Sequence, residues 1–316
     1  VGYILSGGIS PISRSLGLAI DNVIEIEGVW GNGKNFKLNK PGMNSTKQDT
    51  LAWKGLCGAA PFLAIVRNLK LSSYPLASIW IKEAYIDKSQ LIELIQLAED
   101  FPFNSSLQWI WSETIKVYIV IKEDKKDMKY LIDKIESIIC LRQNKGITKV
   151  VKGLINLPEF SISFQGSKPL KRYHSEVLSI VGTDWGNSTN KIIESISNMI
   201  NKRPCIKCSI ASQQIGGKIN SHSRETTSFI HRDKSWKPWI TAAWQAQDNI
   251  QKESALKWMQ EAWETLGPYC PGVHMAQLHP HLITYKKEIE LAFGEWLPDL
   301  KKLKSIYDPK GILPPL

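Results

Sequence analysis

The sequence predicts an α+β fold in which helices cover one face of an antiparallel sheet. Two observations predict it. Between residues 76 and 266, apolar runs typical of strands are interspersed with segments whose apolar residues recur at helical spacing. Their order is strand, helix, two strands, helix, unlike the strict alternation of a parallel sheet. The length of 316 residues, of which 43% are hydrophobic, suits two domains.

The chain opens with a glycine loop followed by a hairpin. Gly7-Gly8 leaves bare backbone, so its N–H groups can approach a flat or anionic ligand closely. Residues 23–29 alternate in polarity like a half-buried strand. A Gly-Asn-Gly turn then predicts a return through a second strand at 36–38.

The later elements follow from the same periodicities. Asp87 is expected to cap a helix, because Gln90 three positions on completes a capping box. The expected helices are 87–98, 126–140, 189–201, 251–266 and 284–307, the last broken near Gly294 and Pro298. The expected strands are 62–66, 79–86, 107–111, 116–121, 206–215, 226–231 and 239–245. A loop is expected at 44–50, a tight turn at 53–61, and a further loop around Pro158, Gly166 and Pro169.

Composition argues against several classes of partner. The net charge is +10, but the basic residues are scattered, so no nucleic-acid partner is expected. A basic nucleic-acid binder is kept as a weaker alternative, which salt-dependent DNA binding would support. No apolar run approaches the ~18 residues that span a bilayer, and no signal peptide is seen. A cytoplasmic protein without a membrane partner is therefore expected.

Cysteine and histidine spacing predicts no metal site. The five cysteines form no disulfide framework. Cys205 and Cys208 have C-x-x-C spacing, but they lack a second ligand pair, and the alternation around them favours a strand. His274, His279 and His281 match no familiar metal-binding spacing.

Three ordered motifs carry a family resemblance. The first motif is Gly2-Tyr3-Ile4-Leu5-Ser6-Gly7-Gly8, followed by Ser13-Arg14, Leu16-Gly17-Leu18 and Asp21-Asn22-Val23. The second is Leu51–Val66, with Gly55-Leu56-Cys57-Gly58-Ala59-Ala60-Pro61 at its centre. The third is Leu303–Pro315, which contains Tyr307-Asp308-Pro309. Together they resemble the vanillyl-alcohol-oxidase / p-cresol-methylhydroxylase (PCMH-type) superfamily, most closely its berberine-bridge-enzyme-like branch.

The resemblance implies a domain arrangement. Residues 1–75 would be the C-terminal part of a PCMH-type FAD-binding domain, and 76–267 a substrate domain with an antiparallel sheet covered by helices. Residues 268–316 would return to the FAD domain. The family's flavin domain has an N-terminal part that would precede Val1, so Val1 looks like a cut, and this chain alone is expected to bind FAD weakly or not at all.

The resemblance also implies a cofactor and site residues. FAD would be the cofactor, and the expected contacts are Gly7, Gly8, Ser10, Arg14, Gly17 and Asn22, with Ile26 and Val29 meeting adenine from an edge-like strand. His231 and Gln277 are the candidate catalytic residues. The implied activity is hydride transfer from a small-molecule alcohol, sugar or amine to flavin, with oxygen or another acceptor taking the electrons.

One segment departs from the family pattern. The family's Tyr-Val-Asn-Tyr corresponds to Met275-Ala276-Gln277-Leu278, which contains no phenol able to accept a proton. The alternative hypothesis is therefore a non-catalytic or decayed family member that acts as a binding protein. Absorbance in the flavin bands would distinguish the two.

Overall fold

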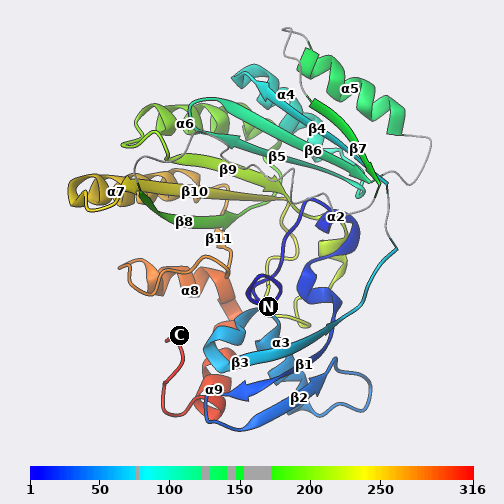
Figure 1. Cartoon of the computed structure of the whole chain (residues 1–316), viewed down its shortest axis with the longest axis vertical. Helices are drawn as coiled ribbons and strands as arrows, with labels where there is room; N and C mark the ends of the chain where they lie inside the picture. The colour runs from blue at the N-terminus through cyan, green and yellow to red at the C-terminus, as the bar shows by residue number, and fades with distance from the viewer. Residues whose placement is uncertain (76–77, 123–127, 141–146, 153–171) are drawn as a thin grey trace. The chain divides into compact units, whose positions relative to one another are not determined.

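A computed structural model describes residues 1–75, 78–122, 128–140, 147–152 and 172–316 (Figure 1). The expected loop around Pro158, Gly166 and Pro169 lies outside these residues. The chain divides into two compact units. Unit 1 comprises Val1–Tyr74, Gly216–Asp233 and Gly272–Leu316, and unit 2 comprises Pro75–Ile215 and Lys234–Pro271. Both ends of the chain thus belong to unit 1, as does 216–233, which the sequence analysis places in the substrate domain.

Unit 1 is built on a sheet of order β2-β1-β3. The strands are β1 (Val23–Trp30), β2 (Asn35–Asn39) and β3 (Ala64–Leu71), all antiparallel. The hairpin expected from the Gly-Asn-Gly turn is confirmed. The helical elements are α1 (Gly2–Leu5), α2 (Ser13–Leu16), η1 (Ala19–Asn22), α3 (Lys47–Leu63), η4 (Gly217–Ser221), α8 (Tyr285–Phe293), η5 (Gly294–Trp296) and α9 (Leu297–Tyr307).

The loop expected at 44–50 and the tight turn expected at 53–61 are wrong over most of their length, because helix α3 begins at Lys47 and ends at Leu63. The Thr46 hydroxyl accepts a hydrogen bond from the Asp49 N–H and so caps the helix. The helical path breaks only from Cys57 to Ala59, where Gly58 has a φ of +127°. Glycine and alanine here serve close packing inside a helix as well as a turn.

The C-terminal motif packs onto the hairpin of unit 1. The Trp30 ring stacks on Phe36 and on Tyr307, with centroid distances of 4.0 and 3.9 Å. The buried Asp308 carboxylate accepts hydrogen bonds from the N–H groups of Ile312 and Leu313. The Tyr-Asp-Pro motif therefore anchors the C-terminal residues of the chain to the β1–β2 hairpin of unit 1.

Unit 2 is organised on an antiparallel sheet whose strands follow the order β8-β10-β9-β5-β6-β4-β7. The strands are β4 (Ser78–Ile86), β5 (Ser105–Trp111), β6 (Ile115–Lys122), β7 (Ile147–Lys152), β8 (Tyr173–Val181), β9 (Ser209–Gln214) and β10 (Trp236–Gln245). Its helices are α4 (Lys88–Glu99), α5 (Met128–Cys140), α6 (Thr189–Asn201) and α7 (Asn249–Leu266), with the short η3 (Gly186–Ser188). The sequence analysis did not predict β7 and β8.

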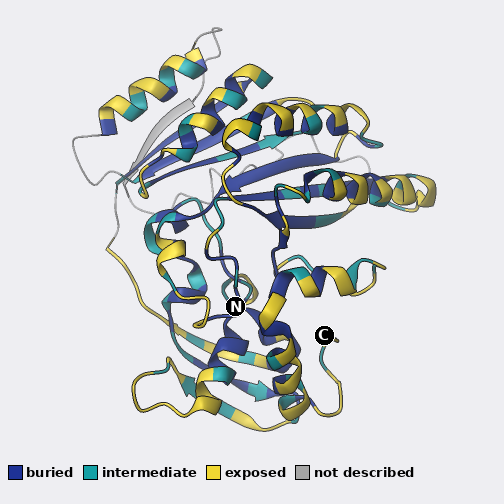
Figure 2. Cartoon of the chain, turned by 180° about the vertical axis from the view of Figure 1, so that it is seen from behind, coloured by how far each residue is buried: buried dark blue, intermediate teal, exposed yellow. Residues whose placement is uncertain are grey.

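The helices of unit 2 lie along one face of this sheet (Figure 1). The Lys82 ammonium on β4 pairs with Glu136 on α5, and the Gln214 amide on β9 donates to the Ala98 carbonyl of α4. Side chains alternate between faces along a strand, so even-numbered β10 residues face the helices and odd-numbered ones face away. The strands are largely buried, whereas the helices expose their outer sides (Figure 2). The predicted α+β class is confirmed.

Two local predictions in this region are wrong. Residues 226–231 form an irregular segment of unit 1, because the Ser228 N–H donates to the Cys57 carbonyl of α3 instead of to a neighbouring strand. Cys205 and Cys208 occupy a turn before β9, closed by a 3.0 Å bond from the Cys208 N–H to the Cys205 carbonyl. Both thiols are free.

The predicted capping box at the start of α4 is confirmed and gives a stability test. The Gln90 N–H donates to the Asp87 carboxylate at 2.9 Å, and the Gln90 side-chain oxygen accepts from the Asp87 N–H at 3.0 Å. We expect Asp87→Ala to lower the free energy of unfolding by about 1 kcal/mol in urea denaturation. Asp87→Asn keeps a capping oxygen and should cost only a few tenths. Equal losses in the two variants would contradict the capping role.

Candidate functional site

The glycine loop of unit 1 adopts backbone conformations that favour glycine. Gly7 has a φ of +113° and Gly8 a φ of +70°. Their carbonyls accept hydrogen bonds from Ile20 and Ala19, which fixes the loop against η1. Within the described residues, the N–H groups of Gly8 and Ile9 donate to no partner. The loop therefore presents two backbone donors that can bind an acceptor oxygen of a ligand.

A second segment lies against this loop. A Cβ built on Gly7 would lie 3.1 Å from the His274 Nε2 atom, and one on Gly58 would lie 2.8 Å from the Met275 sulfur. His274 and Met275 are both buried. The segment after Gly272 thus packs on the glycine loop and on the break in α3, which brings all three places together within unit 1.

Other predicted contacts have structural partners of their own. The Ser10 hydroxyl accepts from the Ile12 N–H, and the Ser10 N–H donates to Ser13. The Asn22 amide donates to the Leu18 carbonyl at 3.0 Å, while the Tyr74 hydroxyl donates to the Asn22 side-chain oxygen.

Arg14 and Gly17, the other two predicted contacts between Ser10 and Asn22, have structural roles. Arg14 is 6% exposed, and its backbone lies so close to Gly217 that a Cβ there would meet the Arg14 carbonyl at 2.6 Å. Gly17 has a φ of +81°. Ser10, Arg14, Gly17 and Asn22 thus take part in the local fold after the glycine loop, and direct ligand contacts from them stay predictions.

The ground for assigning Ile26 and Val29 is wrong, because β1 is the central strand. Ile26 pairs with Leu38 on one side and Leu69 on the other, and Val29 also has partners on both strands. A central strand bonds both of its neighbours, so the expected edge-like strand is absent here, and contact of Ile26 and Val29 with adenine stays a prediction. The sequence signal could not reveal this, since it did not show that residues 64–71 pair with β1.

A buried ion pair joins η1 to residues 216–233. The Arg232 guanidinium donates two hydrogen bonds to the Asp21 carboxylate, at 2.9 and 2.7 Å, and the two side chains are 3% and 1% exposed. Arg232 also donates to the Thr227 hydroxyl at 2.7 Å. Burial lowers the pKa of the nearby His222 imidazole. Arg232 therefore has a structural role beside the predicted catalytic His231.

The two candidate catalytic residues lie in different surroundings. The buried His231 ring packs edge-on against Phe229, whose other contact of this kind is His274 at 5.8 Å. The Gln277 side-chain oxygen is buried and has no hydrogen-bond partner among the described residues. An unpaired buried acceptor suits a ligand donor, and the catalytic role expected of Gln277 stays a prediction.

The histidines considered for metal binding have other partners. The His279 ring bonds the Glu288 carboxylate at 3.0 Å, and the Thr284 hydroxyl holds the other oxygen of that carboxylate. Across the described ranges, no group of three or more potential ligands could hold a metal ion. Within the same ranges, no helix is both long and apolar enough to cross a bilayer.

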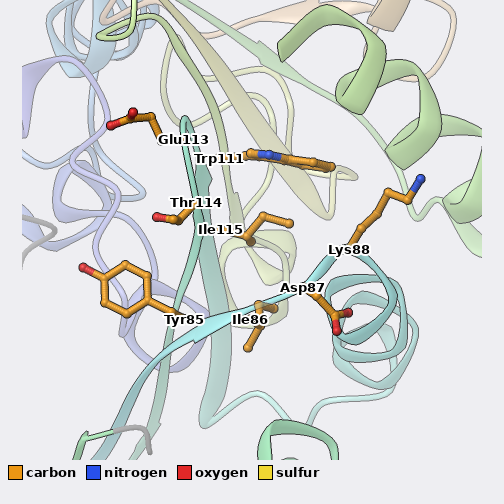
Figure 3. Close-up of a pocket in the computed structure, with 8 residues that line it drawn as sticks. All are labelled: Tyr85, Ile86, Asp87, Lys88, Trp111, Glu113, Thr114 and Ile115. Carbon is orange, nitrogen blue, oxygen red and sulfur yellow. The ribbon is translucent and has the colours of Figure 1, made fainter. Parts of the chain in front are cut away.

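A pocket of about 380 Å³ lies elsewhere, in unit 2 (Figure 3). It is lined where β4 runs into α4 and where β5 turns into β6, by Tyr85, Ile86, Asp87, Lys88, Trp111, Glu113, Thr114 and Ile115. None of the predicted site residues lines it, and its Asp87 carboxylate serves the helix cap. The pocket is therefore separate from the glycine-loop site.

Comparison with known proteins defines the class of fold. The chain has the fold of berberine-bridge-enzyme-like (BBE-like) proteins, in agreement with the resemblance that the sequence motifs predict. It aligns over 99% of its length with BBE-like 1 of Physcomitrella patens, covering 68% of that chain at 17% identity and a TM-score of 0.80.

Two curated relatives match it in sequence. An FAD-linked oxidoreductase of Dictyostelium discoideum is 25% identical over 98% of the chain, and a carbohydrate oxidase of Microdochium nivale is 20% identical over 98%. The chain spans 65% of the length of each relative. No protein-family model matches it.

Proposed function

We propose that this chain forms the larger part of an FAD-dependent oxidoreductase that transfers hydride from a small-molecule alcohol, sugar or amine to flavin. The observation that carries the proposal is the alignment of nearly the whole chain with FAD-linked oxidases in both fold and sequence. Oxygen or another acceptor would then take the electrons from the reduced flavin.

The glycine-loop site fits FAD on its own chemistry. Among the described residues nothing else bonds the Gly8 and Ile9 N–H groups or the Gln277 side-chain oxygen. The two N–H groups can therefore donate to a phosphate or ring carbonyl oxygen, and the Gln277 oxygen can accept from a ring N–H. FAD would supply the hydride-accepting ring. His231 is the chain's candidate for moving a proton, since imidazole titrates near neutral pH.

A second candidate function has a specific observation in its favour. Met275 occupies the place where the family pattern has a tyrosine, and it is buried against Gly7 and Gly58. A thioether cannot accept a proton from a substrate hydroxyl. The second candidate is therefore a binding protein that keeps the fold without turnover.

Flavin titration followed by anaerobic reduction tests both candidates. We expect the encoded protein, including any residues before Val1, to bind FAD with a shift of the flavin absorbance bands. A panel of sugars, alcohols and amines should then bleach those bands, and air should restore them. Binding without bleaching by the panel would favour the second candidate. Absence of binding by the encoded protein would contradict the first.

A further inference from the structure

The turn between α6 and β9 brings two cysteines of unit 2 close together. Cys205 and Cys208 are its first and fourth residues, and the Cys208 N–H closes it by donating to the Cys205 carbonyl at 3.0 Å. The Cα atoms at the two ends of such a turn lie less than about 7 Å apart, which a disulfide can bridge. In the extended strand that the alternation of the sequence predicts, they would lie about 10 Å apart, too far for a bond. The fold therefore gives this C-x-x-C pair the spacing of an oxidisable dithiol.

The sulfur of Cys205 is held over this turn. It accepts a hydrogen bond from the Lys207 N–H at a distance of 3.5 Å between nitrogen and sulfur. Since Lys207 directly precedes Cys208, the bond keeps the Cys205 sulfur on the side of the turn where Cys208 begins. A backbone N–H that donates to a sulfur also favours the thiolate, which is the form that reacts with oxidants.

The two thiols differ in access to solvent. Cys205 is 6% exposed and Cys208 0%, and both residues between them, Ile206 and Lys207, are exposed. The Cys208 sulfur is bonded inside the unit, because it accepts from the Ala243 N–H of β10 at 3.3 Å and donates to the Ala243 carbonyl at 3.5 Å. Burial raises the pKa of Cys208, which keeps it a thiol. A small oxidant entering at the turn therefore meets Cys205 first, with Cys208 behind it.

Metal binding is the other chemistry that a C-x-x-C pair serves. A structural zinc ion takes four ligands, of which this pair would supply two. Over the part of the chain that the structure describes, no group of three or more potential metal ligands includes Cys205 and Cys208. Both thiols are free rather than joined. Their arrangement therefore favours oxidation to a disulfide.

We propose that Cys205 and Cys208 form a dithiol that hydrogen peroxide oxidises to a disulfide. The Cys205 thiolate attacks peroxide, the O–O bond breaks, and a sulfenic acid and one water form. The Cys208 sulfur then attacks the sulfenic sulfur, the S–S bond forms, and a second water leaves. Two thiols thus lose two electrons and two protons to one peroxide, and a thiol reductant reverses the change. Oxygen accepting electrons from reduced flavin would supply peroxide; that source rests on the proposed function, whereas the thiol chemistry requires only unit 2.

Peptide mapping of the 316-residue chain, treated with hydrogen peroxide in the absence of FAD, tests the proposal. Trypsin cleaves after Lys207, so a Cys205–Cys208 disulfide keeps peptides 203–207 and 208–218 joined until a reductant is added. We expect the joined peptides to form at least about 10-fold faster than any oxidised form of Cys140. Cys140 is exposed, but its thiol donates to the Glu136 carboxylate, which disfavours the thiolate. Failure of the peptides to join, or equally fast oxidation of Cys140, would overturn the proposal. Added peroxide makes this result independent of flavin reduction.

Single variants distinguish the roles of the two thiols. In Cys208→Ser the sulfenic acid at Cys205 has no second thiol in the turn, so dimedone, which labels sulfenic acids, should trap it. We expect at least about 10-fold less label on Cys208 in Cys205→Ser, because that sulfur is buried. Cys140→Ser is the matched control and should leave the joined peptides unchanged. Equal labelling of Cys205 and Cys208 would show the proposed order of attack to be wrong. The peptide map of the unaltered chain holds even if a variant fails to fold.

Discussion

Replacing Arg232 by methionine is expected to lower the free energy of unfolding by about 3–5 kcal/mol. The Asp21 carboxylate, 1% exposed, would lose both hydrogen bonds to the guanidinium and remain as an uncompensated buried charge. The loss should appear in urea denaturation as a lower midpoint with an unchanged slope.

A double variant distinguishes the cost of the unpaired Asp21 charge from the cost of lost packing around Arg232. In the double variant Asp21→Asn/Arg232→Met the buried charge is absent, so much of the stability should return. Lys37→Met removes an exposed ion pair with Glu27 and should cost less than about 1 kcal/mol. If Arg232→Met costs no more than Lys37→Met, the ion pair does not hold residues 216–233 to η1.

Substituting alanine for Gly8 is the second change with a large expected effect, about 3 kcal/mol. The left-handed φ of +70° alone costs a non-glycine residue about 1–2 kcal/mol. The new methyl group would in addition lie 2.4 Å from the Ala19 Cβ, which forces the loop away from η1. We expect Gly8→Ala to lower the thermal unfolding midpoint and also to reduce any absorbance change induced by FAD.

Two comparisons distinguish the cost of the left-handed backbone conformation at residue 8 from the cost of the steric clash with Ala19. Gly33 has a φ of +85° with open space around its Cβ position, so Gly33→Ala should show the conformational cost alone. Adding Ala19→Gly to Gly8→Ala removes the collision and should recover part of the stability. If Gly8→Ala and Gly33→Ala lose the same amount, close packing between the loop and η1 is not what requires Gly8.

Local patterns could be predicted because neighbours in sequence decide them. The capping box of Asp87 and Gln90, the turn between β1 and β2, and the apolar face of α6 each depend on residues within about four positions of one another. The strand expected at 226–231 failed for the opposite reason. In the structure Ser228 bonds α3 and Arg232 bonds Asp21, contacts that span 171 and 211 positions respectively.

The candidate site divides in the same way. The glycine loop could be predicted from Gly7-Gly8 because the lack of side chains is itself a local property. The roles of Asn22 and Ile26 could not, because both depend on partners supplied by distant segments. His274 entered the sequence analysis only as a metal ligand, whereas packing places it beside Gly7.

By itself, therefore, the sequence determined the fold class, most helices and strands, and the resemblance to FAD-linked oxidases. Periodicity and the order of motifs depend only on the order of residues along the chain. Only the tertiary structure decided that β1 is central and that Arg232 neutralises Asp21. The physical reason is that strand register and burial arise from pairings between distant residues. The cost of a buried charge depends on what those pairings place beside it.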